Sequence, residues 1–486
     1  MIMIFLLWVI FFYTILSFTK HVTGKKSNTI PSPLRLPVIG NLHQLGRHPH
    51  RSLCYLSHRY GPVMLVHFGV VPVLIISSAE VARDVLKTHD RVFASRPKSK
   101  VYEKVLYGDL HIGSAPYGEY WRKTRSVFVT HLLSNKLVQS FRDVRQEEVN
   151  LLMEKIRKSN SLPVNLSELF SRLTNDVVSR VALGKKYGGT GIDLKELTER
   201  LLRLAGAFTV GTFVPWLAWI DWIRGLDRQR AKTKKEFDEI YEKVIQDHED
   251  KDGHGTDFVD VLLAIQRDKS IGLEINRMHI KAIIVDAFVG GTDSSSTLLE
   301  WEMTELLRHP NCLKRLQEEV RTVCKDRSSV SEDDIKDMKY LNAVLKETLR
   351  LHPSIPLMVP HETIEDVNLR GYHIPAGTMV MINAWAIGRE AATWGPDAES
   401  FRPERHLNSS ADFRGQDFEL IPFGAGRRMC PGMSFAVVLN ELALANLMLG
   451  FDWESTKDQT ETDVAESTGA MIRPMLPLYA IATPTT

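Results

Sequence analysis

The sequence of 486 residues is poor in cysteine, and its four cysteines stand far apart, at positions 54, 312, 324 and 430. No CxxC pair and no cysteine–histidine spacing suited to zinc occurs among them. These absences argue against a disulfide framework and favour a protein that faces the reducing cytosol.

The sequence also lacks an excess of either charge, because 61 basic and 59 acidic residues leave a net charge of +2. A dedicated nucleic-acid binder shows a basic excess or stripe, so we predict no nucleic-acid partner. No internal repeat or linker-like stretch divides the chain. An apolar content of 44% and a charged content of 25% are those of an ordinary globular protein.

One long hydrophobic run is present, over residues 1–18, broken only by Tyr13, Thr14 and Ser17. A bilayer span requires about 17–25 such residues, and the lysines that follow favour a cytosolic position for the rest of the chain. A signal peptide would have a basic start and a small-residue cleavage site, and neither is evident. We predict a single-pass anchor in the endoplasmic reticulum membrane over residues 1–19, a proline-rich hinge over 20–40 and a folded body over 41–486.

The pattern of the body predicts a mainly helical fold with small β-sheets towards its two ends. Residues 60–78 combine β-branched runs with punctuating glycines and a proline, which predicts a hairpin. Residues 79–350 have a mainly helical pattern, whereas 371–389 and the stretch after 471 return to strand and turn character.

Residues 279–310 predict a buried helix that "GGTDSSS" interrupts at 290–296. Two glycines inside a helix cost about 1 kcal/mol each relative to alanine, and buried polar groups require partners. Two interpretations fit this break equally well. Either the helix opens to admit a ligand, with Asp293 and Ser294 facing a cavity, or it kinks and satisfies its hydroxyls internally.

Residues 331–353 predict a second helix, on which Glu347 and Arg350 are neighbours. Ser331 and Asp334 have the spacing of a capping box at its start. Arg405, in "PER" at 403–405, is a candidate third member of a buried ion network with Glu347.

The segment "PFGAGRRMCPG" at 422–432 surrounds Cys430 with glycine and arginine. A buried thiolate needs compensation, and glycines let backbone N–H groups approach a sulfur closely. Arg427 and Arg428 offer donors for carboxylates, and an amphipathic helix predicted from 433 would point its N-terminus at the cysteine. The alternative is a structural buried cysteine, against which the density of glycine and arginine weighs.

Together these motifs resemble the cytochrome P-450 superfamily, the haem-thiolate monooxygenases. The matching positions, in the family's order, are Trp121 and Arg125 of "WRKTR", Gly290, Gly291 and Asp293, Glu347 and Arg350, "PER" at 403–405, and Phe423, Gly424, Gly426, Arg428, Cys430 and Gly432. The resemblance implies a triangular, helix-rich domain over 41–486. Haem b would lie between the oxygen-activation helix and the helix after the cysteine loop.

The resemblance also implies roles for single residues. Cys430 is the expected ligand of the haem iron, and the other expected haem contacts are Trp121, Arg125, Phe423 and Arg428. Electrons would come from NADPH through a separate NADPH-cytochrome P-450 reductase. Asp293 and Ser294 are the expected catalytic pair. The family usually has threonine where Ser294 stands. Serine lacks the methyl group that restricts the rotamer of the threonine side chain, so we expect more uncoupled oxygen reduction.

Family geometry implies a substrate pocket between four apolar segments, which suits a flat neutral aromatic or terpenoid. The expected contacts are Ile112, Ser114, Ala287, Gly291, Thr292, Ile355, Leu357, Met358, Val359, Ala470 and Met471.

Several stretches resemble plant microsomal members, and "VPWLAWIDWI" and "VAESTG" are similar to the furanocoumarin-forming enzymes psoralen synthase and angelicin synthase. This narrower resemblance implies oxidative side-chain cleavage of marmesin or columbianetin to psoralen or angelicin. Alternatives are hydroxylation of a terpenoid, a simple coumarin or another small apolar phenolic. In other classes, the chain would be a thiol hydrolase with Cys430 as nucleophile, or a non-enzymatic haem carrier.

Overall fold

The computed structural model describes residues 29–99, 102–103, 107–186, 194–207, 209–250, 255–268, 274–325, 327–456 and 465–485. The predicted anchor over 1–19 and the first part of the predicted hinge lie outside these ranges. The rest of the hinge runs along the folded body, because the Leu65 N–H donates to the carbonyl of Pro31 at 2.9 Å.

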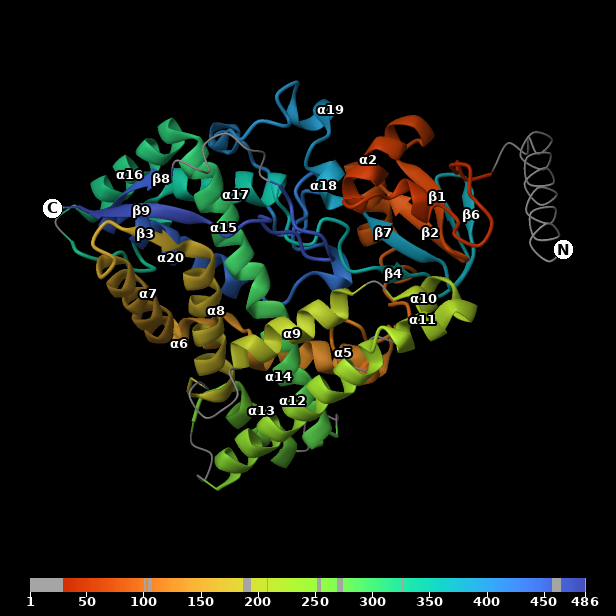
Figure 1. The fold of residues 1–486 in the computed structure, drawn as a ribbon, viewed down its shortest axis with the longest axis horizontal. Helices are drawn as coiled ribbons and strands as arrows, with labels where there is room; N and C mark the ends of the chain where they lie inside the picture. The colour runs from red at the N-terminus through yellow and green to blue at the C-terminus, as the bar shows by residue number, and fades with distance from the viewer. Residues whose placement is uncertain are drawn as a thin grey trace.

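The described chain has a triangular outline, with most helices on one side and the largest sheet at the other (Figure 1). This confirms the predicted helix-rich fold with small sheets. The α-helices are α2 (Pro49–Tyr60), α3 (Ala79–Arg83), α5 (Glu119–Ser126), α6 (Asn135–Ser140), α7 (Arg142–Arg157), α8 (Leu166–Leu183), α9 (Leu194–Gly206), α10 (Val210–Phe213), α11 (Ala218–Ile223), α12 (Leu226–Glu249), α13 (Phe258–Arg267), α14 (Arg277–Gly291), α15 (Asp293–Arg308), α16 (Pro310–Cys324), α17 (Lys339–Leu351), α18 (Ala384–Ile387), α19 (Ala391–Trp394) and α20 (Met433–Gly450).

Shorter 3-10 and π-helical turns connect or extend these helices. They are η1 (Leu42–Gln44), η2 (Asp84–Thr88), η3 (Gly108–Leu110), η4 (Val127–Leu132), η5 (Pro215–Leu217), η7 (Ile335–Asp337), η8 (Pro403–His406) and η9 (Gly426–Arg428).

The strands form three small sheets, with the orders β1-β2-β7-β4, β3-β9-β8 and β5-β6. Their bounds are β1 (Val63–Phe68), β2 (Val71–Ile76), β3 (Pro163–Asn165), β4 (His361–Glu362), β5 (Val367–Leu369), β6 (Tyr372–Ile374), β7 (Met379–Ile382), β8 (Phe451–Ser455) and β9 (Tyr479–Pro484). The predicted hairpin is confirmed, because β1 and β2 pair antiparallel with Val63 opposite Ile76.

One strand departs from the prediction that strands lie only towards the chain ends. The strand β3 sits between α7 and α8 and pairs antiparallel with β9, with Val164 opposite Ala480. Three residues have too little alternation to be recognised, and this strand forms because β9 offers it an edge.

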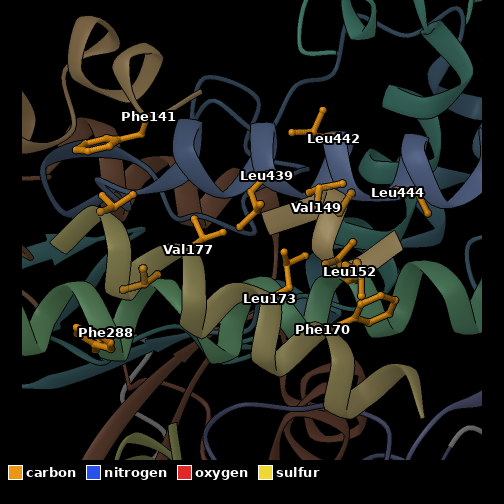
Figure 2. Close-up of a cluster of buried hydrophobic side chains, with 14 of the residues drawn as sticks. Phe141, Val149, Leu152, Phe170, Leu173, Val177, Phe288, Leu439, Leu442 and Leu444 are labelled. Atoms are coloured by element: carbon orange, nitrogen blue, oxygen red, sulfur yellow. The ribbon is translucent and has the colours of Figure 1, made fainter. Parts of the chain in front are cut away.

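The main core lies where α7, α8, α14 and α20 pack together, with side chains such as Phe170, Leu173 and Leu439 between them (Figure 2). The prediction of an amphipathic helix from 433 was wrong in one respect, because the side chains from Leu439 to Leu449 are buried on every face. Among the described residues, α20 is the one unbroken helix long and apolar enough to cross a membrane, yet two thirds of it is buried inside the body. It is therefore a core helix.

Two predicted helices differ in detail from the structure. The break at 290–296 is real, since α14 ends at Gly291, α15 begins at Asp293 and Thr292 lies between them. The second helix begins at Lys339 rather than near Ser331, although the Ser331 hydroxyl does donate to Asp334 at 2.8 Å. That contact closes a turn which precedes η7.

Candidate haem site

The loop that carries Cys430 is folded back on itself just before α20. The Cys430 N–H donates to the carbonyl of Phe423 at 2.9 Å, which closes the loop. Gly424 and Gly426 have left-handed φ angles of +72° and +66°. A Cβ atom at Gly426 would also overlap the carbonyl oxygen of Leu86, so only glycine fits there.

Cys430 as a residue keeps accessible surface, although the protein surrounds its thiol. Burial raises the pKa of its thiol, while the backbone N–H of Gly432, the guanidinium of Arg125 and the N–H of Met433 act in the opposite direction. The accessible surface shows that open space borders the residue. The N–H donors at the start of α20 are those that a thiolate requires.

Three arginines gather on one side of this space without a carboxylate partner among the described residues. Burial, followed by repulsion from Arg96 and Arg125, lowers the pKa of Arg428 to about 8. Burial lowers the pKa of Arg96 to about 10. An anion beside such a cluster would offset the repulsion within it, and the two propionates of a haem would supply that anion. The residues present therefore fit a haem with a cysteine ligand.

Two further predicted haem contacts lie in the same region. The indole N–H of Trp121 donates to the carbonyl of Ile112 at 3.0 Å, and the Arg428 guanidinium lies 4.1 Å from the centre of the Trp121 ring. Phe423 packs edge-on against Phe413, with ring centres 5.7 Å apart. Arg427, by contrast, pairs with the carboxylate of Asp90 at 3.0 Å at the surface, so a role of Arg427 toward a haem propionate stays a prediction.

Sequence reasoning missed Arg96 and His361. The guanidinium of Arg96 donates to the carbonyls of Gly113, Val359 and Pro360 at 3.1, 2.6 and 2.8 Å. Burial, then repulsion from Arg96, holds the pKa of His361 well below its usual range, so this ring is neutral. Neither residue lies in a periodic pattern, and only the tertiary fold brings them beside Arg428.

The break between α14 and α15 has features of both interpretations given above. The hydroxyls of Thr292 and Ser294 donate to the carbonyls of Phe288 and Gly290, each at 2.7 Å. A Cβ atom at Gly290 would nevertheless meet nothing within 4 Å, so open space borders the helix there. Burial raises the pKa of Asp293, while Arg473 opposes that shift.

The structure brings together the four segments predicted to surround a substrate. The Ser354 hydroxyl donates to the carbonyl of Ser294 at 3.4 Å, and the Ile472 N–H donates to the carbonyl of Ser354 at 2.9 Å. The contacts of Arg96 join the loop at Gly113 to the stretch at Val359. These bonds hold the loop near 112, the break in α14, the stretch 354–359 and the turn at 470–472 around one region.

Individual side chains in these segments differ in how open they are. The Ser114 hydroxyl is buried without a partner among the described residues. A Cβ atom at Gly291 would lie 3.0 Å from Val178 of α8, so this residue packs against a helix. Leu357 and Met358 pack at the edges of two different apolar clusters. The substrate contacts of these residues and of Ile112, Ala287, Thr292, Ile355, Val359, Ala470 and Met471 stay predictions.

Comparison with known proteins decides the family, because the sequence profile described as Cytochrome P450 matches residues 30–480. The chain is a cytochrome P450. It is similar to Cytochrome P450 71A23 of Arabidopsis thaliana, with 68% identity over 486 residues that cover 100% of both chains. Cytochrome P450 71A26 of the same plant is 70% identical over 491 residues, again covering 100% of both chains.

A third similar protein has a name that states a reaction. It is Indoleacetaldoxime dehydratase of Arabidopsis thaliana, with 50% identity over 465 residues that cover 94% of each chain. The family is that of haem-thiolate monooxygenases, so the haem-carrier and thiol-hydrolase alternatives are overturned.

Proposed function

We propose that this cytochrome P450 holds haem b through the Cys430 thiolate and draws electrons from NADPH through a separate reductase. The observation that carries the proposal is the accessible residue Cys430, with the Gly432 and Met433 N–H groups at its thiol and the cluster of Arg96, Arg125 and Arg428 nearby. When bound, the haem supplies oxygen activation. The chain holds the propionates with these arginines and the Trp121 indole, and it holds a proton near the break at Asp293 and Ser294.

The electron supply has a direct test. Microsomes that contain the full chain, reduced with dithionite under carbon monoxide, are expected to absorb near 450 nm, and NADPH is expected to replace dithionite only when the reductase is present. An open groove of about 840 Å³ lies beside α20 and is a candidate docking surface for the reductase. Its lining carries both charges, with Arg142, Arg145, Lys336 and Lys339 beside Glu332, Asp333 and Glu441. A spectrum without the thiolate band would refute the role of Cys430.

For the substrate, we propose a dihydrofuranocoumarin such as marmesin or columbianetin. The segments around Ile112, Gly290 and Ile355 are apolar with few polar groups, which suits a flat neutral ring system. The reaction takes one O2, and NADPH with a proton supplies two hydrogens. A hydrogen is abstracted from the dihydrofuran ring and the side chain leaves as acetone. The furan double bond forms and two waters are released.

A second candidate is dehydration of an aldoxime to a nitrile, favoured by the similarity to Indoleacetaldoxime dehydratase. In this reaction the C–H and N–OH bonds break, a C≡N bond forms and one water leaves. No net electrons are required, so NADPH consumption separates the two candidates.

The discriminating experiment uses microsomes with the full chain, reductase and NADPH, incubated separately with marmesin, columbianetin and indole-3-acetaldoxime. Psoralen or angelicin with an equal amount of acetone supports the first candidate, and the preferred substrate shows linear or angular specificity. A nitrile formed without stoichiometric NADPH supports the second. If none of the three substrates gives a product while the thiolate spectrum is intact, both candidate reactions are refuted. Hydroxylation of terpenoids or simple coumarins would then be screened.

We also propose that the chain is anchored in the endoplasmic reticulum membrane by residues 1–19, with its body in the cytosol. Exposed apolar side chains support this, namely Leu34, Leu36, Val38 and Ile39 after the anchor and Trp216, Trp219, Trp222 and Ile223 around α11. The two groups lie on the same side of the molecule (Figure 1). They adjoin, since Gly69 donates to Ile39 and Val70 donates to Phe213. Tryptophan at an exposed apolar face suits a membrane interface.

The membrane proposal is tested on the full chain in microsomes. Carbonate at high pH should leave the protein in the membrane pellet, and protease added outside the vesicles should digest the body. A soluble protein after carbonate, or a body protected from protease, would refute the proposed anchor or its orientation.

A further inference from the structure

The substrate loop, residues 107–115, is held by a buried polar contact to α14. The Nδ1 atom of His111 lies 3.0 Å from one carboxylate oxygen of Asp286, and the Ile112 N–H donates to the other oxygen at 2.9 Å. His111 is 2% exposed and the Asp286 side chain 11%. Asp286 thus accepts one hydrogen bond with each oxygen, both from the same loop.

A second contact fixes the tautomer of His111. The Tyr107 N–H donates to Nε2 of His111 at 2.9 Å, so Nε2 carries no proton. The ring proton is therefore on Nδ1, where it is donated to Asp286. Tyr107 and His111 also stack, with ring centres 6.1 Å apart. The imidazole joins the start of the loop to α14 through both of its nitrogens.

Ile112 connects this contact to the cysteine loop. Its N–H donates to Asp286, while its carbonyl accepts from the Trp121 indole at 3.0 Å and from the Arg428 guanidinium at 3.2 Å. One peptide segment is therefore held by α14 on one side and by two predicted haem contacts on the other. Asp286 lies on α14, five residues before that helix ends at Gly291 and seven before Asp293.

We propose that Asp286 and His111 form a latch that sets the position of the substrate loop, and that they are positioning residues for substrate selectivity. The inference rests on the proposed function, which places Ile112 and Ser114 of this loop beside the substrate. Ser114, whose buried hydroxyl lacks a partner among the described residues, follows the latch by three positions, and its N–H donates to the carbonyl of His111 at 3.2 Å. A shift of the latch therefore moves the side chains that face the ligand space.

The informative variant is Asp286→Asn in the full-length holoenzyme. An amide has the same shape but only one acceptor oxygen, so it can accept from Ile112 or from His111 and presents a donor to the other. Glu242→Gln is the control for loss of one carboxylate at α14, because Glu242 forms ion pairs with two α14 residues, 2.7 Å from Lys281 and 2.6 Å from Arg277, and makes no hydrogen bond to the described residues of the substrate loop. Both variants should keep the carbon monoxide band near 450 nm.

The first readout is hydrogen exchange at the Ile112 amide. Loss of a hydrogen bond to a charged group should accelerate exchange about 10- to 100-fold in Asp286→Asn and leave it unchanged in Glu242→Gln. Unchanged exchange in Asp286→Asn would overturn the latch. If that variant does not fold, His111→Leu should give the same acceleration. His111→Asn, whose amide N–H can reach the same carboxylate, should then restore slow exchange.

The second readout is the size selectivity of azole binding, measured by the Soret shift with imidazole and with 4-phenylimidazole. The ratio of the two dissociation constants should change at least about threefold in Asp286→Asn and stay constant in Glu242→Gln. An unchanged ratio despite faster exchange would overturn the positioning role and leave the haem proposal standing. Absence of azole binding in the unmodified protein would refute the haem proposal, and the positioning role with it, whatever the exchange shows.

Discussion

Glu302 is a buried acid that the fold accommodates poorly. It lies on α15 with 0% exposure, and neither of its carboxyl oxygens has a hydrogen-bond partner among the described residues. Burial, followed by repulsion from Glu441, raises the pKa of Glu302 well above its usual value. The folded protein therefore binds a proton at Glu302 more tightly than the unfolded chain does.

The sign of the pH dependence follows from this difference. Because the folded state binds the extra proton, the stability associated with Glu302 is fully present below the unfolded pKa of about 4.5 and is lost as pH rises towards the folded pKa. The loss reaches about 1.4 kcal/mol per pH unit between these two values. Methionine has similar length and no charge, so Glu302→Met should remove this loss together with the cost of an unpaired buried polar group, about 1–3 kcal/mol.

The assay is thermal unfolding of the full-length holoenzyme between pH 6 and pH 8. An unfolding entropy of about 2.1 cal/mol/K per residue over roughly 450 residues makes 1 kcal/mol equivalent to about 1 °C in Tm. At pH 6, roughly 1.5 pH units above 4.5, the pH-linked loss of about 2 kcal/mol adds to the cost of the unpaired group, so Glu302→Met should melt about 3–5 °C above the unmodified protein. The gap should widen by roughly 1 °C for each further pH unit up to the folded pKa.

Two control variants separate the possible causes. Glu302→Gln keeps a buried polar group but cannot ionise, so it should remove the pH dependence and recover less of the stability. Glu305, one turn further along α15, is a matched glutamate whose pKa shifts in the opposite direction. Burial acts to raise its pKa, but hydrogen bonds from His309 and His352 lower it. Glu305→Gln should therefore destabilise by about 1–3 kcal/mol at every pH in this range. A Glu302→Met variant that is less stable at all pH values, or a gap independent of pH, would refute the reasoning.

Four further predictions concern the site and its support. Burial acts to raise the pKa of Glu347, but hydrogen bonds from Arg350 and His406 lower it to about 2. The stabilisation from Glu347 is therefore present above about pH 4.5 and is lost as pH falls towards 2. Glu347→Gln should lower the free energy of unfolding by about 3–5 kcal/mol in denaturant, and a loss below about 1 kcal/mol would contradict a buried network. Cys430→Ser should abolish the 450 nm carbon monoxide band, and a retained band would assign the ligand elsewhere. Ser294→Thr should release less peroxide per NADPH, whereas equal release would show that the Gly290 contact already fixes the serine hydroxyl. Arg428→Gln should weaken haem retention but raise the Tm of the haem-free protein, because it relieves repulsion from Arg96 and Arg125; a lower Tm without haem would refute the charge argument.

Much of the fold could be predicted because its signals are local. The hairpin at β1 and β2 shows in its β-branched runs, and the break between α14 and α15 shows in the glycines at 290 and 291. The ion network around Glu347 was predicted from two spacings, and the structure confirms it: Arg350 and Arg405 both donate to Glu347, at 2.8 and 2.9 Å. The short strand β3 and the all-round burial of α20 depend on distant partners, so no local pattern indicated them.

The site could be predicted only where a motif is compact. Cys430, Trp121 and Arg428 lie in dense, recognisable segments, whereas Arg96, His361 and Asp286 come from three unrelated parts of the chain. Asp286 is a single acid between apolar neighbours on α14, and the residues beside it in the sequence do not indicate its partners. Its function depends on a loop 175 residues earlier in the sequence, which a pattern along one helix cannot reveal.

The fold around Cys430 buries arginines and a cysteine whose charged forms the protein alone does not neutralise. Burial disfavours the charged forms of Arg428 and Arg125 in the protein by itself, repulsion from Arg96 and Arg125 adds to this effect at Arg428, and burial also disfavours the thiolate of Cys430. A stable protein rarely buries like charges without a partner, so the missing anion has to come from a ligand. A dianionic group whose metal binds the thiolate resolves both costs together, since it supplies carboxylates to the arginines and a cation to the sulfur. The haem therefore completes the electrostatics of the fold as well as the chemistry of the site.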